Sequence, residues 1–447
     1  MYTEFSIYKS FACLWVERGL RARSIHGQPT NDGDHPMKAK HFLPAALLSA
    51  LATASQAEPL KIAMIEALSG PTAQTGIAFN EGLRYGVMKL NEAGGFNGEK
   101  VQLVEYDNLG GPSGASEKLR AAIADGVRIV TSAGSSAAAA QLSEDIRKYN
   151  LRNPGKEVIY WNTGSEAYEL TAEKCHFWFF RMSTNPFIRM NGLVKTMKDT
   201  GVLGDKVYSI NQNYSYGHEQ QAAQAAAVAK AGSKIVEATL HDTNKIQDFS
   251  PYVAKIKASG ATTVLTGNWA NDIILLLKAT GEAGLKVQFG NTSLDTPGVL
   301  SNAGASALGA YLVKPYNLEA GGEKGKAFIE DFKAKIGHYP YSEQPTSAFA
   351  TLHLGQALKK LDFKGGAINP TQLALALESA TYESPTGTMS FRKEDHQGIF
   401  PITVSQVSKD ARFKADGTDM GFRLVKVVSP SDAAAPLSPA CKMRRPG

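Results

Sequence analysis

The chain has few cysteines, few aromatic residues and little net charge for its length. Its 447 residues include three cysteines, 9% aromatic residues and a formal net charge of +6. A weak positive excess without a zinc-finger, RNP-like or basic-region pattern disfavours nucleic-acid binding, so no nucleic-acid partner is expected. Cysteine and histidine neighbours at zinc-ligand spacing are also missing, which disfavours a metal site.

Signatures of catalysis are missing as well. No GxGxxG follows a strand-like run, and GxxxxGK(S/T), GxSxG and HExxH do not occur. These motifs would mark nucleotide, phosphate, acyl-transfer or zinc chemistry, so we expect neither an enzyme nor a cofactor. The sequence does have an ordinary globular composition, with 43% apolar and 20% charged residues, over a length that suits two lobes.

The N-terminal region has the pattern of a secretory signal. From Met37, two lysines precede an apolar run that ends at Leu51, and Ser55-Gln56-Ala57 places small residues at the −3 and −1 positions of a cleavage site. The run is shorter than the about 20 residues that cross a bilayer. We predict a signal peptide at 37–57, a misassigned extension at 1–36 and a periplasmic mature chain that starts at Glu58. A buried helix or a membrane anchor is the alternative.

Two cysteines would remain after cleavage. Cys13 lies before the predicted cleavage site, whereas Cys175 and Cys441 lie after it. An oxidising compartment permits a disulfide between Cys175 and Cys441, and two free thiols are the alternative.

Strand-like apolar runs alternate with helical patterns at intervals of about 30 residues, as βαβ units do. One series has strands at 60–66, 101–107, 127–131 and 158–162, and a second has strands at 207–211, 234–240, 263–267 and 286–289. We predict an α/β chain with two doubly wound, Rossmann-like lobes, a helical region at 319–380 and an extended tail from 410. Such sheets bind ligands at the carboxyl ends of their strands.

Short motifs follow one another in an order typical of one family. They are Ser69-Gly70-Pro71, Asn91-Glu92-Ala93-Gly94-Gly95-Phe96-Asn97-Gly98, Glu105-Tyr106-Asp107, Gly134-Ser135-Ser136, Thr163-Gly164-Ser165, Tyr216-Gly217 and Pro385-Thr386-Gly387. With this set of motifs the chain resembles the type I periplasmic solute-binding proteins of ABC importers. In particular it resembles the branched-chain (hydrophobic) amino-acid binding family, whose members are similar to leucine-binding protein.

The resemblance implies a monomer that closes around a small carboxylate-bearing ligand and delivers it to membrane permease subunits. It also implies three crossings between lobes, near Met182, Tyr316 and Glu383. Lobe 1 would comprise 58–182 and 317–383, lobe 2 would comprise 183–316 and 384–428, and 429–447 would form a tail.

The resemblance and the predicted strand ends together indicate ligand-binding residues. A helix N-terminus with serine hydroxyls suits a carboxylate, although a serine there can simply cap the helix. Aromatic side chains in the second lobe would cover an apolar group, with ordinary packing as the alternative. The candidates are Ser135, Ser136, Thr163, Gly164 and Ser165 for the carboxylate, Tyr214, Tyr216, Asn268 and Trp269 for the lid, and Asp295 and Thr75 as further contacts.

Three departures from the family pattern bear on the ligand. The acid that the resemblance implies just after Arg181 is missing from residues 182–186, and a second is missing at Thr292-Ser293-Leu294 unless Asp295 replaces it. Thr75 replaces a first-loop aromatic residue. Because a buried ammonium needs a charge partner, an amine-free or aromatic carboxylate competes with an amino acid as the ligand. A ligand-sensing receptor subunit of the same fold and an exported α/β enzyme are the alternative functions.

Overall fold

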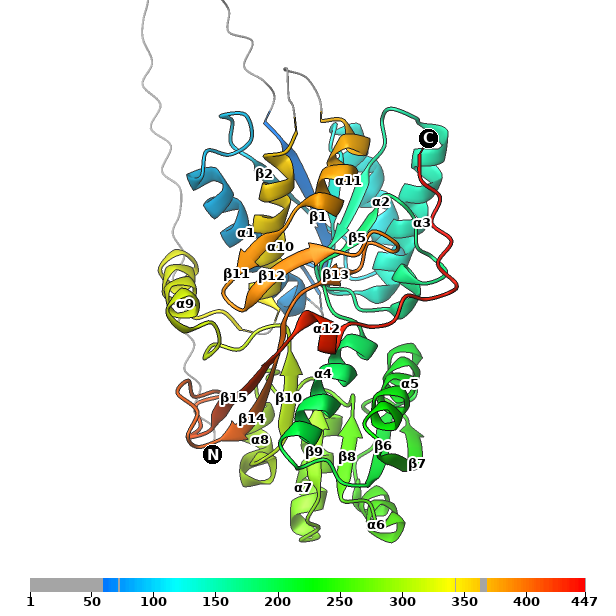
Figure 1. The fold of residues 1–447 in the computed structure, drawn as a ribbon, viewed down its shortest axis with the longest axis vertical. Helices are drawn as coiled ribbons and strands as arrows, with labels where there is room; N and C mark the ends of the chain where they lie inside the picture. Colours follow the sequence, from blue (N-terminus) through cyan, green and yellow to red (C-terminus); the bar gives the residue numbers. More distant parts are fainter. Residues whose placement is uncertain (1–58, 71–72, 342, 362–367, 447) are drawn as a thin grey trace, which may run out of the picture. The chain divides into compact units, whose positions relative to one another are not determined.

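The computed structural model describes residues 59–70, 73–341, 343–361 and 368–446, which belong to one compact unit. The predicted signal peptide at 37–57 and the extension at 1–36 lie outside these residues. Two large sheets with flanking helices make up most of the described chain (Figure 1). Within the described residues, no helix has both the length and the apolarity to cross a bilayer.

The first sheet is parallel, with the strand order β2-β1-β3-β4-β5. Pleating sends Ile62 and Met64 of β1 into a core shared with helix α1, and Ala63 and Ile65 into a core shared with α2 and α3. Because helices cover both faces, β1 is apolar over most of its length. We call this sheet and its helices lobe 1: β1 (Lys61–Glu66), α1 (Ala73–Glu92), β2 (Gln102–Asp107), α2 (Pro112–Ala124), β3 (Ile129–Thr131), α3 (Ser136–Arg152), β4 (Ile159–Asn162), η1 (Tyr168–Thr171) and β5 (Phe179–Arg181).

The second sheet has the order β15-β14-β10-β9-β8-β6-β7, in which the five strands from β6 to β10 run parallel and β14 and β15 are antiparallel. We call it and its helices lobe 2. Its elements are α4 (Pro186–Asp199), β6 (Lys206–Gln212), α5 (Ser215–Lys230), β7 (Lys234–His241), α6 (Ser250–Ser259), β8 (Thr263–Thr266), α7 (Asn271–Glu282), β9 (Gln288–Asn291), α8 (Val299–Ala303), η2 (Gly304–Ala307), β10 (Tyr311–Lys314), β14 (Ile402–Ser408) and β15 (Gly421–Val428). The predicted α/β class with two doubly wound lobes is confirmed.

Two crossings between the lobes lie at 182–185 and 315–321. After the second, helices α9 (Gly322–Ile336), α10 (Gln344–Leu358) and α11 (Pro370–Ser379) return to lobe 1, where α10 packs along α1. The third crossing comes later than the predicted Glu383. Strands β11 (Tyr382–Ser384), β12 (Gly387–Phe391) and β13 (Gly398–Ile399) form a small sheet, and Gln397 is hydrogen-bonded to the Arg181 side chain at the end of β5. The chain therefore enters lobe 2 only at β14.

Residues after 410 were predicted to form an extended tail, but they include β15, which pairs with β14 at the edge of the second sheet. Six of its eight residues are partly or fully exposed, so the apolar run of a buried strand is missing from the sequence.

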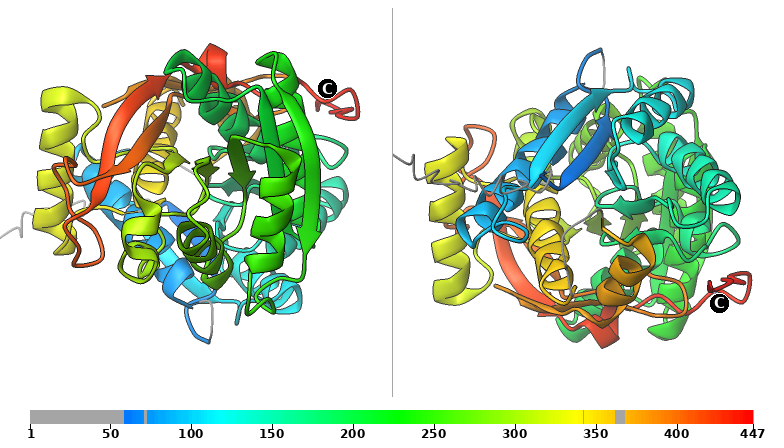
Figure 2. Two further views of the ribbon diagram at one scale, coloured as in Figure 1. Left: turned by 90° about the horizontal axis from the view of Figure 1, so that it is seen from below. Right: turned by 90° about the horizontal axis from the view of Figure 1, so that it is seen from above.

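The segment after β15 is a fourth link between the lobes, which Figures 1 and 2 show in red. Its helix α12 (Pro430–Ala433) lies on α4, where the Asn191 amide donates to the carbonyl of Ala434 at 3.0 Å. The chain then reaches lobe 1, where Cys441 forms a disulfide with Cys175 and Arg445 pairs with Glu378 at 2.6 Å. We call residues 429–446 the C-terminal strap.

We expect Cys441→Ser to lower the free energy of unfolding by about 2–5 kcal/mol, because removing a native disulfide that closes a long loop typically costs this much. The loop here spans 266 residues. Cys175→Ser and the double variant should lose the same amount, since all three lack the same bond. Urea denaturation under oxidising conditions measures the losses, and an unchanged stability would contradict a stabilising role for the bond.

Candidate functional site

The loops after β3 and β4 lie side by side at the carboxyl end of the first sheet. Ser165 joins them, because its buried hydroxyl donates to the carbonyl of Ala133 at 2.8 Å. Ser135 is the N-cap of α3, and its hydroxyl oxygen accepts the amide of Ala138 at 3.3 Å, so the capping alternative holds for this side chain. Ser136 is the exposed first residue of the helix. The three serines therefore gather at the α3 N-terminus, where an anion is favoured.

Thr163 and Gly164 determine the conformation of the loop after β4. The Thr163 side chain is fully buried, and its hydroxyl lies 3.4 Å from that of Thr131. The amide of Gly164 donates to Asn162 Oδ1 at 3.0 Å, and a Cβ at this position would lie 2.6 Å from Phe79. Glycine is therefore required where the loop packs against α1.

A carboxylate of the protein itself occupies part of the loop after β3. Glu66 is the last residue of β1 and is 2% exposed. Its Oε2 accepts the amides of Ala133 at 2.7 Å and Gly134 at 2.8 Å. The sequence analysis missed Glu66, although an acid that ends an otherwise apolar strand was an available signal. Since these two amides point to Glu66, the serines and the α3 N-terminus are the groups left for an external anion.

Aromatic side chains of lobe 2 form a connected layer at the ends of β6 and β8. Trp269 Nε1 donates to the Tyr214 hydroxyl at 2.9 Å, and the Tyr214 and Tyr216 rings lie 5.9 Å apart. The Tyr216 hydroxyl lies 3.0 Å from Thr292 Oγ1, which ties this layer to the end of β9. Tyr214 and Trp269 are each more than a third exposed, so their rings are available to cover a ligand.

Asn268 has a different position from its neighbour Trp269. Its side chain is fully buried, and its Oδ1 lies 3.0 Å from His241 Nε2. Its carbonyl accepts the Asn291 side-chain amide at 2.9 Å. Asn268 therefore joins the ends of neighbouring strands and is no part of the exposed lid.

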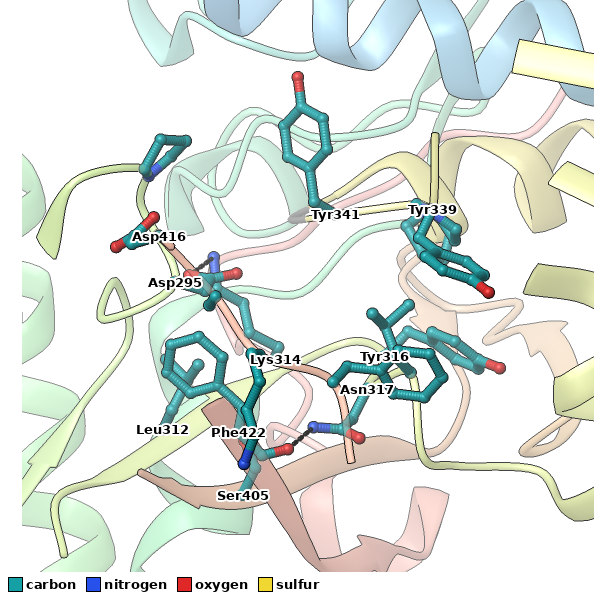
Figure 3. Close-up of a pocket in the computed structure, with 17 residues that line it drawn as sticks. Asp295, Leu312, Lys314, Tyr316, Asn317, Tyr339, Tyr341, Ser405, Asp416 and Phe422 are labelled. Atoms are coloured by element: carbon teal, nitrogen blue, oxygen red, sulfur yellow. Dashed lines mark hydrogen bonds and ion pairs between the residues drawn. The ribbon is translucent and has the colours of Figure 1, made fainter. Parts of the chain in front are cut away.

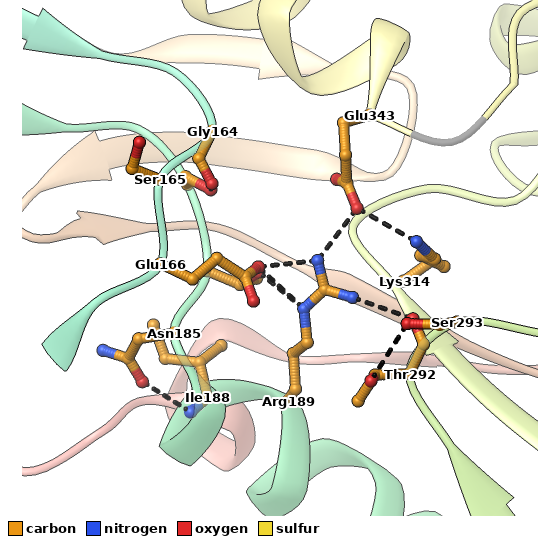
Figure 4. Close-up of polar contacts among 12 residues, drawn as sticks. Gly164, Ser165, Glu166, Asn185, Ile188, Arg189, Thr292, Ser293, Lys314 and Glu343 are labelled. Atoms are coloured by element: carbon orange, nitrogen blue, oxygen red, sulfur yellow. Dashed lines mark hydrogen bonds and ion pairs between the residues drawn. The ribbon is translucent and has the colours of Figure 1, made fainter. Parts of the chain in front are cut away.

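The residue at the centre of the interlobe contact is Arg189 of α4, which the sequence analysis missed (Figure 4). Its guanidinium pairs with two carboxylates of lobe 1, Glu166 at 2.6 Å and Glu343 at 2.9 Å. Lys314, at the end of β10, lies 3.1 Å from Glu343 and 3.0 Å from Asp295. We call these five residues the interlobe ion cluster.

Residues 182–186 contain no acid, as the sequence analysis states, but Glu166 lies beside them in the structure. The acid comes from the neighbouring loop, directly after Ser165, and it accepts a hydrogen bond from the Thr184 hydroxyl. Sequence spacing could have suggested Glu166, because it follows a predicted carboxylate contact at a strand end. Sequence spacing does not predict the ion pair between Arg189 and Glu343, because these residues are 154 positions apart.

The electrostatics of the ion cluster favour the charged forms of Arg189 and Glu343, but not that of Asp295. Burial opposes the charge of Arg189, but Glu166 and Glu343 outweigh this effect and raise the pKa of the guanidinium. Burial likewise disfavours the Glu343 carboxylate, yet Lys314 and Arg189 lower its pKa to about 2. Burial raises the pKa of Asp295 despite its contact with Lys314. Three carboxylates thus face two cations.

The two remaining candidates, Thr75 and Asp295, line separate pockets. Thr75, in the first turn of α1, lines a pocket of about 240 Å³ together with Ser135 and Glu66. Asp295 lines another of about 340 Å³, where Tyr316, Tyr339, Tyr341 and Phe422 supply aromatic walls (Figure 3). The candidate residues therefore fall into a serine group in lobe 1, an aromatic layer in lobe 2 and Asp295 within the ion cluster. Within the described residues, no three His, Cys, Asp or Glu side chains gather as metal ligands.

Comparison with known proteins finds one family throughout. Residues 59–412 match the model of the periplasmic binding proteins. The chain is 51% identical over 403 residues to the Leu/Ile/Val-binding protein homolog 4 of Brucella melitensis, covering 90% of this chain and 97% of that protein. It is 27% identical to the leucine-, isoleucine-, valine-, threonine- and alanine-binding protein of Pseudomonas aeruginosa, over 79% of this chain and 91% of that one. A solved structure of the leucine-, isoleucine-, valine-, threonine- and alanine-binding protein from Brucella ovis, in a closed conformation, is 51% identical in sequence with a TM-score of 0.85. The match covers 87% of this chain and all of the Brucella ovis chain. These relatives are binding proteins by name, not enzymes.

We expect the free energy of unfolding to fall as the pH is lowered from about 4.5 toward about 2. The lowered pKa of Glu343 means that its ionised form stabilises the fold above this range, and the contribution is lost as the carboxylate is protonated. Glu343→Gln should lower the free energy of unfolding by about 3 kcal/mol at pH 7, because it removes the carboxylate that Arg189 and Lys314 share, and should flatten the acid dependence. Denaturant unfolding at several pH values measures both effects. Glu173→Gln, at an exposed position, is the matched control, and an equal effect there would contradict the assignment.

Proposed function

Because this chain belongs to the periplasmic binding protein family, we propose that it is the substrate-binding component of an ABC importer and that its ligand is an α-amino acid with a small, mainly aliphatic side chain, a class that includes threonine as well as leucine, isoleucine and valine. The ligand lies between the serine group of lobe 1 and the aromatic layer of lobe 2. The chain performs no reaction on it and uses no cofactor. The predicted signal peptide would deliver the chain to the periplasm, where membrane permease subunits receive the ligand.

The observation that carries the choice of an amino acid is the charge balance of the interlobe ion cluster. Its three carboxylates, Glu166, Glu343 and Asp295, face two cations. A buried negative charge without a partner is costly, and the ammonium of an amino acid is the group that offsets it. The missing acids that favoured an amine-free carboxylate are thus replaced from other positions of the chain.

The carboxylate and the side chain of the ligand have separate partners. The N-terminus of α3, with Ser135 and Ser136, offers free amides and a favourable dipole to the carboxylate. The exposed rings of Tyr214 and Trp269 cover an apolar side chain. The names of the relatives mention leucine, isoleucine and valine, and two of them also mention threonine and alanine, which supports a small, mainly aliphatic side chain.

Titration calorimetry with leucine and two matched analogues tests this proposal. We expect leucine to bind and 4-methylpentanoate, which lacks the ammonium, to bind at least about 30-fold more weakly, because a buried charge contact is worth about 2–5 kcal/mol. Leucinamide, which lacks the carboxylate, should also bind weakly. Tighter binding of 4-methylpentanoate or benzoate than of any aliphatic amino acid would overturn the choice of ligand.

Glu166→Gln tests the ammonium contact. We expect leucine affinity to fall by about 30-fold or more while the weak affinity for 4-methylpentanoate changes little, because only leucine carries the group that Glu166 attracts. Calorimetry on this variant and on the Glu173→Gln control measures the two affinities. An equal loss for both ligands would mean that Glu166 acts through the fold of the cleft and not through the ammonium.

A further inference from the structure

We infer that Glu66 determines specificity for the ligand's side chain, and that it selects side chains that carry a hydroxyl group. This inference rests on the proposed function, because it assigns a role to a pocket beside the carboxylate-binding serines. Nothing in the sequence motifs pointed to Glu66, and the fold places it beside two of the predicted contacts.

The position of Glu66 is unusual for an acid. It is 2% exposed at the carboxyl end of β1, and no Lys, Arg or His among the described residues forms an ion pair with it. Three backbone amides supply its hydrogen bonds instead: Ala133 and Gly134 donate to Oε2, and Ala67 donates to Oε1 at 3.1 Å. These amides supply most of the hydrogen bonds that the carboxylate can accept.

The carboxylate is part of the wall of a pocket. The pocket holds about 240 Å³ and is lined by Glu66, Ala67, Thr75, Gly110, Gly134 and Ser135. Glu66 is the one charged side chain among these six described residues. Ser135 and Glu66 line the same pocket, so we place the side chain of a ligand whose carboxylate lies at the α3 N-terminus beside Glu66.

The hydrogen-bonding capacity of the carboxylate specifies the group that fits. Two carboxylate oxygens accept about four hydrogen bonds, and three positions are taken by the amides. The open position is on Oε1, which lies 3.0 Å from where a Cβ of residue 134 would be, so Gly134 leaves the approach free. One open acceptor matches one hydroxyl donor, whereas an ammonium brings three donors.

Thr75 makes room for this contact. It is exposed in the first turn of α1, and a larger side chain there would fill the space in front of Glu66. A site that hydrogen-bonds a hydroxyl discriminates against an analogue without it, whereas a purely apolar pocket hardly distinguishes the two. Threonine and valine are the matched pair for this contrast, since they have nearly the same shape.

The experiment is calorimetry with threonine and valine on the wild-type chain, Glu66→Gln and Thr75→Tyr. Charge-assisted hydrogen bonds are about twice as strong as neutral ones, so we expect Glu66→Gln to shift the threonine-to-valine affinity ratio toward valine by about tenfold. Thr75→Tyr leaves the loop amides untouched and fills the pocket, and it should shift the ratio in the same direction.

The outcomes separate this inference from the proposed function. A wild-type chain that binds no amino acid would overturn the proposed function and this inference together. If threonine and valine bind but the ratio stays within about twofold in both variants, only the role of Glu66 is overturned. An equal loss for both ligands in Glu66→Gln, with an unchanged ratio in Thr75→Tyr, would mean that Glu66 only holds the loop.

Discussion

Arg189 brings together residues that the chain keeps far apart. Its guanidinium lies in lobe 2 and pairs with Glu166 and Glu343 of lobe 1, and Lys314 adds a second cation from lobe 2. Because all these groups are largely withdrawn from water, each depends on the others for its charge. Separating the lobes would hydrate all of them, so the contact between lobes depends on a balance of desolvation and pairing. A charged ligand that contacts the cluster can shift the equilibrium between separated and contacting lobes through only a few contacts.

The cleft uses its charged groups in two ways. Carboxylates on the side of Arg189 are paired with cations, whereas Glu66 is held by backbone amides alone. Paired carboxylates respond to the overall charge of a ligand. An amide-held carboxylate, with one acceptor position free, responds to the geometry of a single donor. Under the proposed function, net charge and side-chain chemistry are therefore selected by two separate groups of residues.

The sequence predicts the fold well and the site only in part. Alternating apolar runs and helical patterns locate the parallel strands, because strands covered on both faces need continuous apolar residues. The edge strand β15 does not follow this pattern, since six of its eight residues are partly or fully exposed. Strand ends locate the serines and the aromatic layer. The partners of Arg189 come from segments far apart in the sequence, with Glu166 after β4 and Glu343 directly before α10, and no spacing pattern predicts that they meet. The buried Asn268 and Thr163 show the converse, since residues at strand ends also serve to join the strands.

The C-terminal strap has a consequence for the order in which the molecule is completed. Cys441 follows Cys175 by 266 positions, and all the elements of lobe 2 lie between them. Because the chain is synthesised from its N-terminus, Cys175 has no partner cysteine until all of lobe 2 and the C-terminal strap have been made. From residue 59 onward these are the only two cysteines of the sequence, so once the predicted cleavage has removed Cys13 a single intramolecular pairing is possible. The bond thus marks a finished molecule, because it joins only after both lobes are present.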